Sequence, residues 1–388
     1  MTGYDVCADG DLGAVHYLVR QGFGMAGDVF ERYRALFGTA ALRVLRRDGD
    51  ISACAAVFDV DQWFGGRPVP ARGVACVTVD PIARGTGTGS ALVRAMLEEA
   101  RGAGRALSIL YPATRPLYAR AGYGPAGVRI EWSAPPAALA GPHSVARPTR
   151  QVPPDLGALA ALRRTGPALA NGMLERSEAL WALRLDPLGE GTADLFLLPG
   201  ADGPGGYAAV LPPRERRLLV PDQCVAGRRA VAEALAFLAG YRAQVDRVCW
   251  CGGPDDPLAL LAHDSGVVPV QYEEWMLRVV DVERALTCRG YPSRASESLV
   301  LDVTDPLLPA NHGRFRLTPA AGRGRVERLP SQGAADVALH IAALAPLYTG
   351  HRSPSALRAV GLVEGSDDAI MRAEQLFAGP RPWMADQF

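Results

Sequence analysis

Lysine is absent from the 388 residues of this chain, and neither sign of charge is in excess. Acidic and basic residues number 41 each, so every basic side chain other than histidine is arginine. A protein without net charge has no long-range field with which to hold a nucleic acid or an anionic membrane. We therefore expect neither nucleic acid nor membrane as a partner.

Cysteine is sparse and scattered, and long apolar runs are missing. The nearest pair among the seven cysteines, Cys249 and Cys251, is spaced C-x-C. This spacing suits neither a zinc site nor a disulfide framework, and no histidine clusters with metal-ligating residues, so we predict no metal. No run approaches the ~20 apolar residues of a membrane span, and the first residues lack the regions of a signal peptide. We therefore predict a cytoplasmic protein.

The composition and length indicate a globular protein of two or three domains. Hydrophobic residues make up 48% of the chain and charged residues 21%, which is typical of a packed, water-soluble protein. A single core rarely organises a chain of this length.

The first 135 residues alternate strand-like and helix-like patterns. Strands are expected at 44–45 and 53–58, followed by a turn at 65–68. Residues 74–79 are almost all apolar, as in a strand buried on both faces. The Pro- and Ala-rich stretch 134–148 is expected to be a linker.

A second region, from 155 to about 290, carries no catalytic constellation and is expected to be a structural domain. Helical periodicity covers 156–170 and 228–243, and strands are expected at 217–220 and 248–250.

A third region follows Pro292. Alternation over 337–342 predicts a half-buried strand with His340 on its outer face. Ser366 precedes two acidic residues and predicts a helix start, and the helix is expected to stop at Gly379-Pro380. The tail 381–388 carries Trp, Met and a terminal Phe, so it is expected to pack rather than fray.

The strongest chemical signal is a glycine-rich turn between the strand at 74–79 and a helix. The apolar stripe of that helix repeats at helical spacing; it consists of Leu92, Val93, Met96, Leu97 and Ala100. Unpaired amides at a helix N-terminus attract anions, and glycines let a diphosphate approach the backbone. Arg84 can add charge-assisted hydrogen bonds. A purely structural turn is the alternative.

The spacing within the turn excludes two common phosphate-binding motifs. A Walker A loop needs a lysine, and Gly85, Gly87 and Gly89 give G-x-G-x-G rather than the dinucleotide fingerprint. What remains is Val-x-Pro followed by Arg-x-x-Gly-x-Gly, which resembles the acetyl-coenzyme A motif of the GNAT acyltransferase superfamily.

The resemblance extends to the bacterial enhanced intracellular survival (Eis) N-acetyltransferases. It touches all three regions in order, through segments 65–70, 117–124, 275–282 and 347–352 and the terminal phenylalanine. The resemblance implies an α+β fold with two tandem GNAT-like domains of mixed, mostly antiparallel sheets flanked by helices. A sterol-carrier-protein-like α/β domain follows them. We expect the domains at 1–140 (acetyl-CoA site), 150–290 (no cofactor) and 293–388.

The same resemblance assigns the cofactor site. The backbone near Val79 would polarise the thioester carbonyl, as in an oxyanion hole, while the strand binds the pantetheine arm and the turn binds the pyrophosphate. The implied residues are Val77, Thr78, Val79, Arg84, Gly85, Thr86, Gly87, Thr88, Gly89, Ser90, Ala113 and Thr114.

Two catalytic residues are implied. Tyr118 occupies the family's general-acid position, and the terminal carboxylate of Phe388 acts as the base; residues 379–388 can extend about 33 Å, enough to reach another domain. The alternatives are a core tyrosine and a tail that merely packs. Tyr123 is the nearest rival to Tyr118, but its flanking glycines favour a turn position.

A cationic acceptor needs acid nearby, and Asp28, Glu31 and Asp386 are the expected substrate-binding residues. The leading hypothesis is an acetyl-CoA-dependent N-acetyltransferase acting by direct transfer on a small-molecule amine, with aminoglycoside-type antibiotics as the class the resemblance suggests. A biosynthetic acyltransferase using another acyl-CoA or an O-acceptor, and a non-catalytic lipid- or acyl-CoA-binding protein, are the alternatives. The resemblance also implies a homo-oligomer, specifically a hexamer.

Overall fold

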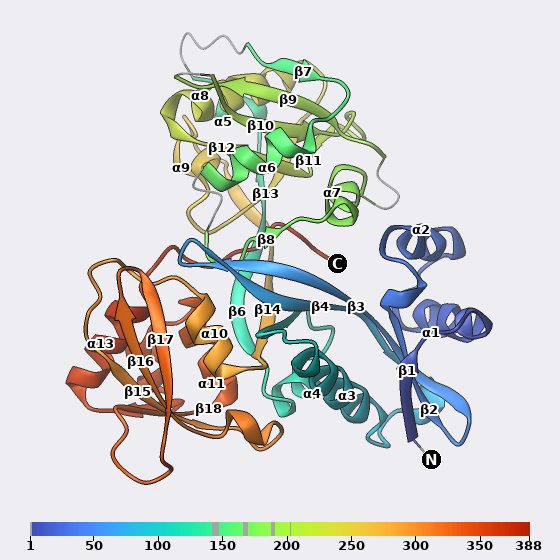
Figure 1. Cartoon of the computed structure of the whole chain (residues 1–388). Coiled ribbons are helices and arrows are strands. Elements are labelled where there is room, and N and C mark those ends of the chain that lie inside the picture. The colour runs from blue at the N-terminus through green and yellow to red at the C-terminus, as the bar shows by residue number, and fades with distance from the viewer. Residues whose placement is uncertain (1, 142–146, 166–169, 188–190, 202) are drawn as a thin grey trace. The chain divides into compact units, whose positions relative to one another are not determined.

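The computed structural model describes residues 2–141, 147–165, 170–187, 191–201 and 203–388 (Figure 1). Its contacts divide the chain into two compact units, each assembled from separate stretches of sequence. Unit 1 contains the described residues up to Gly127, then Glu274–Pro380 and Phe388; unit 2 contains Val128–Glu273 and Arg381–Gln387.

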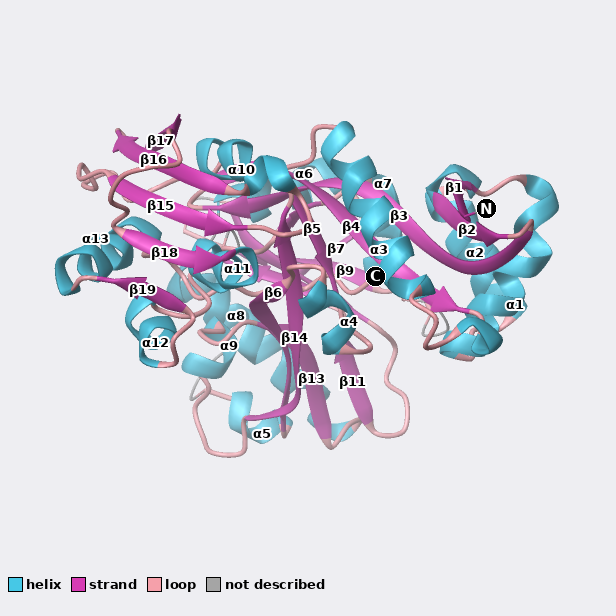
Figure 2. Ribbon diagram, turned by 90° about the horizontal axis from the view of Figure 1, so that it is seen from below, coloured by secondary structure: helices cyan, strands magenta, loops and turns pink. Residues whose placement is uncertain are grey.

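The N-terminal part of unit 1 is a twisted sheet in the order β1-β2-β3-β4-β5-β14, visible in Figure 2. All neighbours are antiparallel except β4 and β5, which are parallel. The strands are β1 (Thr2–Val6), β2 (Leu42–Arg47), β3 (Asp50–Phe64), β4 (Arg67–Val79), β5 (Leu107–Leu110) and β14 (Val268–Val279, in unit 1 from Glu274).

Four helices accompany this sheet: α1 (Leu12–Phe23), α2 (Gly27–Phe37), α3 (Thr88–Gly102) and α4 (Arg115–Arg120). The predicted apolar stripe of α3 is confirmed, because all five of its residues are buried in the core that α3 shares with the sheet. The predicted strands at 44–45, 53–58 and 74–79 are confirmed inside β2, β3 and β4. The turn is confirmed at Gly65-Gly66, but Arg67 and Pro68 already belong to β4.

A polar cluster fixes α3 to the sheet. Arg43 on β2 donates from Nε to Glu99 on α3 at 2.9 Å, and Arg72 on β4 reaches the same carboxylate at 3.2 Å. Partial burial alone would raise the pKa of Glu99, but hydrogen bonds from Arg43 and Tyr4 outweigh it and lower the pKa to about 2. With this pKa, Glu99 is ionised at neutral and mildly acidic pH.

The C-terminal part of unit 1 follows α10 (Val282–Cys288) and contains a five-stranded sheet in the order β17-β16-β15-β18-β19. Helices α11 and α13 contact β15. The elements are β15 (Leu299–Thr304), η5 (Pro309–Asn311), β16 (Gly313–Ala320), β17 (Arg323–Leu329), β18 (Val337–His340), α11 (Ile341–Thr349), α12 (Pro354–Ala359), β19 (Val363–Gly365) and α13 (Asp367–Phe377).

Sequence expectations for this region are largely confirmed. Ser366 caps α13 by accepting from the Ala369 amide, and α13 ends before Gly379. The strand prediction was two residues too long: β18 ends at His340, whose exposed side chain caps α11 by accepting from the Ala342 amide at 3.2 Å. Ile341 is therefore the first helical residue, because the cap turns the chain.

Unit 2 contains two sheets. In one, β13 lies between β6 (antiparallel) and β11 (parallel); the other has the antiparallel order β12-β10-β9-β7. Its elements are β6 (Gly124–Ala134, in unit 2 from Val128), α5 (Pro136–Leu139), β7 (Thr149–Gln151), α6 (Leu156–Thr165), β8 (Leu174–Glu175), α7 (Glu178–Leu185), β9 (Asp194–Pro199), β10 (Pro204–Val210), β11 (Arg217–Val220), β12 (Asp222–Val225), α8 (Gly227–Ala239), η4 (Gly240–Ala243), β13 (Arg247–Gly252) and α9 (Pro257–Leu260).

The linker prediction at 134–148 was wrong over its first half. Ala134 ends β6, and α5 buries Leu139 in the core built around α8, because alanine and leucine side chains in this stretch supply apolar surface. Residues 142–146 of the predicted linker lie outside the described residues. The helix predicted at 156–170 is confirmed as α6 up to Thr165, and 166–169 also lie outside the described residues. The predicted helix 228–243 is confirmed as α8 continued by η4.

Each unit receives a strand from a distant part of the sequence. In unit 1, residues 276–279 of β14 pair with β5, and in unit 2, residues 130–134 of β6 pair with β13. The contiguous domain boundaries expected from the sequence stay a prediction. None of the helices within the described ranges has the length and apolarity needed to traverse a bilayer.

The Glu99 cluster gives a pH-dependent prediction for stability. Because the pKa of Glu99 is lowered from about 4.3 in an unfolded chain to about 2, its stabilisation is complete above about pH 5 and is lost as pH falls toward 2. Replacing Glu99 with Gln should cost about 2 kcal/mol of unfolding free energy at pH 7. Denaturant unfolding of both proteins should show this difference shrinking between pH 5 and pH 3, and a difference independent of pH would contradict the assignment.

Candidate active site

Strands β4 and β5 separate after a short stretch of pairing. They pair only from Ala71 with Leu107 to Gly73 with Ile109. Beyond that point, within the described residues, the β5 side of β4 has no ladder partner over residues 74–79. Cys76 has a φ of +52° at a register shift against β3, so a bulge bends β4 there. Along Val77, Thr78 and Val79 one edge of β4 is therefore left without a paired strand, and it can pair with an extended ligand.

The glycine turn that follows β4 requires glycine at two positions. Gly85 has a φ of +77° and Gly87 a φ of +84°, in the left-handed region that side chains with a Cβ disfavour. No atom lies within 4 Å of a Cβ built at either glycine. The space beside these two backbones is open, which suits the approach of a bulky anion.

The first turn of α3 supplies unpaired donors. Gly87 is the N-cap and has no side chain to accept from the helix, so among the described residues no side chain at the N-cap binds the first amides of α3. Thr88 is buried, Ser90 is exposed, and Gly89 packs against Val79 and Leu117. The Thr86 hydroxyl donates to the Ala83 carbonyl at 2.8 Å, which fixes the turn.

Two arginines bring positive charge to this turn. Arg84 is exposed within it. Arg47, at the end of β2, donates to the Thr86 hydroxyl at 2.8 Å and to the Thr86 carbonyl at 3.2 Å. Sequence reasoning missed Arg47, which stands 37 positions before Arg84; only the β2–β3 hairpin carries it to the turn. The donors and charge at this site fit a diphosphate.

The loop between β5 and α4 holds the next predicted residues. Ala113 and Thr114 are exposed there, and Thr114 is the N-cap of α4. Tyr118 lies inside α4 and is buried, whereas Tyr123 lies in the turn after it, as expected.

The two tyrosine hydroxyls differ in their partners. The Tyr123 hydroxyl shares a 2.7 Å hydrogen bond with Ser108. Within the part of the chain that the structure describes, Tyr118 has no such partner, and burial raises its pKa to about 12. Tyr118 therefore stays protonated at physiological pH, with a hydroxyl available to a ligand.

The terminal residue, Phe388, belongs to unit 1. Its ring meets Phe58 edge-on at 4.8 Å between centroids and Tyr111 at 6.0 Å. Phe58 lies directly over Gly73, where a Cβ would collide with its ring. Because Gly73 ends the β4–β5 pairing, Phe388 lies where the two strands begin to separate.

The preceding tail residues pack within unit 2, which confirms the predicted packing of the tail. Met384 and Ala385 are buried. The Met384 amide donates to the Val128 carbonyl at 3.0 Å, and the Trp383 amide donates to Asn171 at 2.9 Å.

The three predicted acidic residues occupy different environments. Asp386 is buried and accepts from Arg176 Nε at 2.6 Å, and Arg176 also binds Asp222. Asp28 is exposed in the first turn of α2. Glu31, one turn later, accepts from Arg34 Nε at 2.8 Å. A substrate-binding role for all three stays a prediction.

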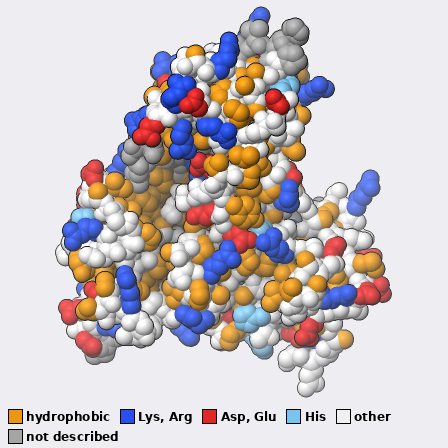
Figure 3. Space-filling view, turned by 180° about the vertical axis from the view of Figure 1, so that it is seen from behind, with side chains coloured by type: hydrophobic (Ala, Val, Ile, Leu, Met, Phe, Trp, Pro, Cys, Tyr) orange, Lys and Arg blue, Asp and Glu red, His pale blue; other side chains and the backbone are white. Residues whose placement is uncertain are grey.

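Two surface observations bear on partners. Over the described ranges, no group of three His, Cys, Asp or Glu side chains is arranged to hold a metal ion. Acidic and basic side chains are interspersed on the face drawn in Figure 3, in keeping with the balanced charge of the sequence.

Comparison with known protein families yields three consecutive matches. An acetyltransferase (GNAT) domain matches residues 4–126, a second acetyltransferase (GNAT) domain matches residues 172–279, and a sterol carrier protein domain matches residues 282–385.

Whole-chain relatives are also found. An uncharacterized N-acetyltransferase of Streptomyces griseus is 32% identical over 369 residues, covering 84% of this chain and 83% of the relative. N-acetyltransferase Eis of Mycobacterium tuberculosis is 28% identical over 363 residues, covering 85% of this chain and 84% of Eis. The crystal structure of a GCN5-related N-acetyltransferase from Anabaena variabilis matches with a TM-score of 0.94 at 31% identity, over 100% of both chains.

Proposed function

Because the chain belongs to the Eis-like family of GNAT N-acetyltransferases, we propose that it transfers an acetyl group from acetyl-coenzyme A directly to an amino group of a small molecule. One observation carries the proposal: a strand that loses its neighbour leads through a left-handed glycine turn into an uncapped helix. An extended thioester arm and a diphosphate need these two features side by side.

The coenzyme would be held mainly by backbone groups. Val77, Thr78 and Val79 would pair with the pantetheine arm along the open side of β4, with a backbone N–H near Val79 directed at the thioester carbonyl. Residues 85–90 would bind the pyrophosphate, assisted by Arg47 and Arg84. Ala113 and Thr114 would lie beside the reactive end. The coenzyme supplies the activated acetyl group.

Tyr118 would act as the proton donor to the departing sulfur. With a pKa of about 12, complete proton transfer to a thiolate of pKa about 8.5 is uphill by about 5 kcal/mol. Tyr118 would therefore stabilise the sulfur by a hydrogen bond and release its proton late. Tyr123 is the weaker candidate because Ser108 already engages its hydroxyl.

The terminal carboxylate of Phe388 would accept the proton that the acceptor ammonium loses. A terminal carboxyl has a reference pKa of about 3.5, far below that of an amine, so a water relay and a site that favours the neutral amine are required. The contacts of Phe388 with Phe58 and Tyr111 support this role, because they keep the chain end beside the point where the pairing of β4 and β5 ends.

The acceptor is proposed to be a small cationic amine, with aminoglycoside-type antibiotics as the first class to test. Asp28 and Glu31 would supply acid near it. The buried pair with Arg176 leaves Asp386 less available for a substrate.

Calorimetric titration with acetyl-coenzyme A tests the cofactor assignment. The protein should bind it in the micromolar range, and replacing Arg47 with Gln should weaken binding about 3- to 10-fold, with a smaller effect at high salt. Arg217, exposed on unit 2, provides a matched control through the same substitution. Absence of binding heat on folded protein would overturn the proposal.

Turnover against a mixed amine library, followed by thiol release and mass spectrometry, tests the reaction. Acetylated amines are expected. Preference for a longer acyl-CoA or for an O-acceptor would favour a biosynthetic acyltransferase, and coenzyme binding without any thiol release would favour a binding protein.

Replacing Tyr118 with Phe should lower kcat about 10²-fold, because the sulfur loses its donor. The dissociation constant of acetyl-coenzyme A should change less than twofold in titration calorimetry. Tyr123→Phe is the comparison, since it removes only the hydrogen bond to Ser108. A larger loss of kcat for Tyr123→Phe than for Tyr118→Phe would reverse the assignment.

Adding one alanine after Phe388 should lower kcat sharply while leaving coenzyme binding intact, because the carboxylate moves away from its present position. A C-terminal amide prepared by semisynthesis removes the charge without adding bulk and should have the same effect. Normal steady-state rates in both proteins would exclude the terminal carboxylate from the reaction.

A homo-oligomer, specifically a hexamer, is also proposed. Val268, Val270 and Tyr272 alternate along β14 and are exposed, as expected of an apolar strip that an interface covers. Light scattering that gives the 41.1 kDa mass of one chain would contradict this proposal.

A further inference from the structure

The two ends of α4, the helix that carries Tyr118, are both held by β14. Glu274 and Arg278 are four residues apart on this strand, so their side chains lie on the same face. Glu274 binds Arg115, the first residue of α4, and Arg278 binds the carbonyl of Ala121, the residue directly after it. All of these residues belong to unit 1.

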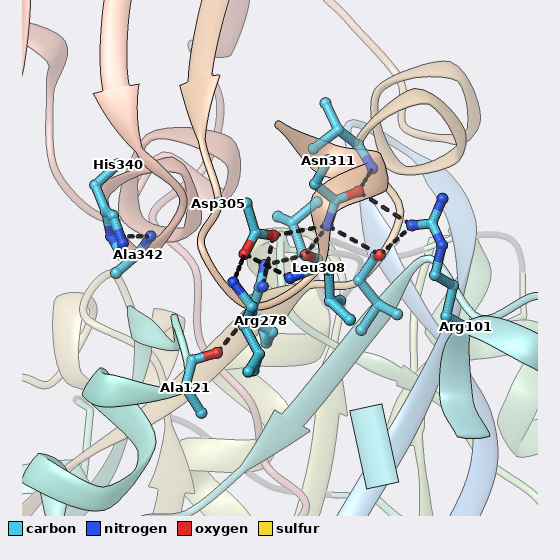
Figure 4. Close-up of polar contacts among 12 residues, drawn as sticks. Arg101, Ala121, Arg278, Asp305, Leu308, Asn311, His340 and Ala342 are labelled. Carbon is cyan, nitrogen blue, oxygen red and sulfur yellow. Dashed lines mark hydrogen bonds and ion pairs between the residues drawn. The ribbon is translucent and has the colours of Figure 1, made fainter. Parts of the chain in front are cut away.

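At the C-terminal end of α4, three nitrogens of Arg278 have three different acceptors. Nε donates to the Ala121 carbonyl at 2.9 Å, one terminal nitrogen to the Val279 carbonyl at 2.6 Å, and the other to Asp305 at 2.6 Å. Figure 4 shows Arg278 between Ala121 and the loop that carries Asp305. A planar guanidinium with fixed donor directions allows little freedom in this position.

The turn after α4 is shaped around this guanidinium. Gly122 has a φ of +85°, and a Cβ there would lie 2.7 Å from Arg278 Nε. The amides of Ala121 and Tyr123 both donate to the carbonyl of Tyr118, at 2.9 and 3.1 Å. The bond from Arg278 to Ala121 therefore fixes the same turn that closes on the backbone of Tyr118.

Asp305, from the C-terminal part of unit 1, is the counter-charge of Arg278. Both side chains are fully buried. The amides of Leu307 and Leu308 donate to one carboxylate oxygen at 3.0 Å each, and Asn311 donates to the other, also at 3.0 Å. A buried ion pair adds little net stability, but it is geometrically demanding, and removing one partner leaves an uncompensated charge.

At the N-terminal end of α4, Glu274 joins α4 to the loop after α11. Its carboxylate accepts from Arg115 at 2.5 Å and from Arg352 at 2.9 Å, and it hydrogen-bonds His351 Nε2 at 3.0 Å. His351 and Glu274 are largely buried, whereas Arg115 is half-exposed or more. Residues of the C-terminal part of unit 1 thus bind both of the β14 side chains that contact α4.

We propose that Arg278 and Glu274 are positioning residues for Tyr118, and that Asp305 and His351 hold them in place. In this arrangement the sterol-carrier-like domain has a catalytic task besides ending in Phe388: it fixes the helix from which the proton donor projects. The proposal rests on the proposed function, since it concerns the hydroxyl that serves the departing sulfur.

A double-mutant cycle separates positioning from general stability. Arg278→Lys keeps the charge but loses the forked geometry, and it should lower kcat about 10-fold with the acetyl-coenzyme A dissociation constant unchanged. In a Tyr118→Phe background the same substitution should change kcat less than twofold, because the group it positions is gone. Equal losses in both backgrounds, or no loss in the first, would overturn the proposal.

Arg101 provides a matched control from the same cluster. It donates to the Val280 carbonyl at 2.8 Å and to Asn311 at 3.1 Å, and among the described residues none of its hydrogen bonds or ion pairs reaches α4 (Figure 4 shows Arg101 beside Asn311). Arg101→Lys should therefore leave kcat within twofold of the parent. A loss as large as that of Arg278→Lys would show that the effect belongs to the cluster as a whole and would overturn the proposal.

Two further measurements keep the test decisive. If Arg278→Lys fails to fold, Glu274→Gln in the same two backgrounds takes its place, because this end of α4 is less buried. Hydrogen exchange of the amides at residues 117–121 should be faster in either variant than in the parent protein. If the parent shows no turnover, the proposed function fails, while unchanged exchange would overturn the positioning role separately.

Discussion

Everything at the candidate active site depends on the early end of pairing between two parallel strands. β4 and β5 share only three residue pairs, and a bulge at Cys76 then bends β4. A strand with unpaired backbone groups inside a sheet is costly unless something else pairs with it. Three features of the candidate site lie where this pairing ends. Among the described residues, one edge of β4 is unpaired, α3 begins next to it without a side-chain cap, and the terminal Phe388 lies at the point where the two strands separate.

The core of unit 2 is organised around a cluster of buried charges. Its core holds Asp222, which Arg176 binds through two nitrogens and to which the Tyr207 hydroxyl donates. Burial alone would raise the pKa of Asp222, but the neighbouring arginines hold it below its usual range. Arg176 also binds Asp386 of the tail. The same buried charges that organise this unit thus restrain the tail two residues before its end.

Most of the sequence segments that resemble the Eis family have a packing role in this structure. Gly65 and Gly290 approach so closely that a Cβ on either would collide with the other's backbone. The Tyr348 hydroxyl donates to the Ala285 carbonyl at 3.1 Å, and the segment around Trp275 supplies Arg278. These contacts join the N-terminal and C-terminal parts of unit 1. At Gly65 and Gly290 the two backbones approach each other, and a side chain would not fit between them.

The sequence by itself determined the local features of the site. Apolar runs and helical periodicity located β3, β4 and α3, and Gly85, Gly87 and Gly89 marked the turn before α3, because these patterns act over a few residues. Ser366 likewise marked the start of α13. The strand end at His340 and the helix α5 were misjudged, since capping by a side chain and burial against α8 depend on neighbours that a short window does not contain.

Only the tertiary structure decided which distant residues meet. Arg47 reaches the turn through the β2–β3 hairpin, and Arg278 reaches the end of α4 because β14 pairs with β5 across more than 150 residues of sequence. Ser108, on β5, hydrogen-bonds the Tyr123 hydroxyl, whereas no described residue hydrogen-bonds the Tyr118 hydroxyl. Sheet pairing joins strands irrespective of their separation along the chain. For that reason these contacts could not be predicted from sequence patterns, which extend over only a few residues.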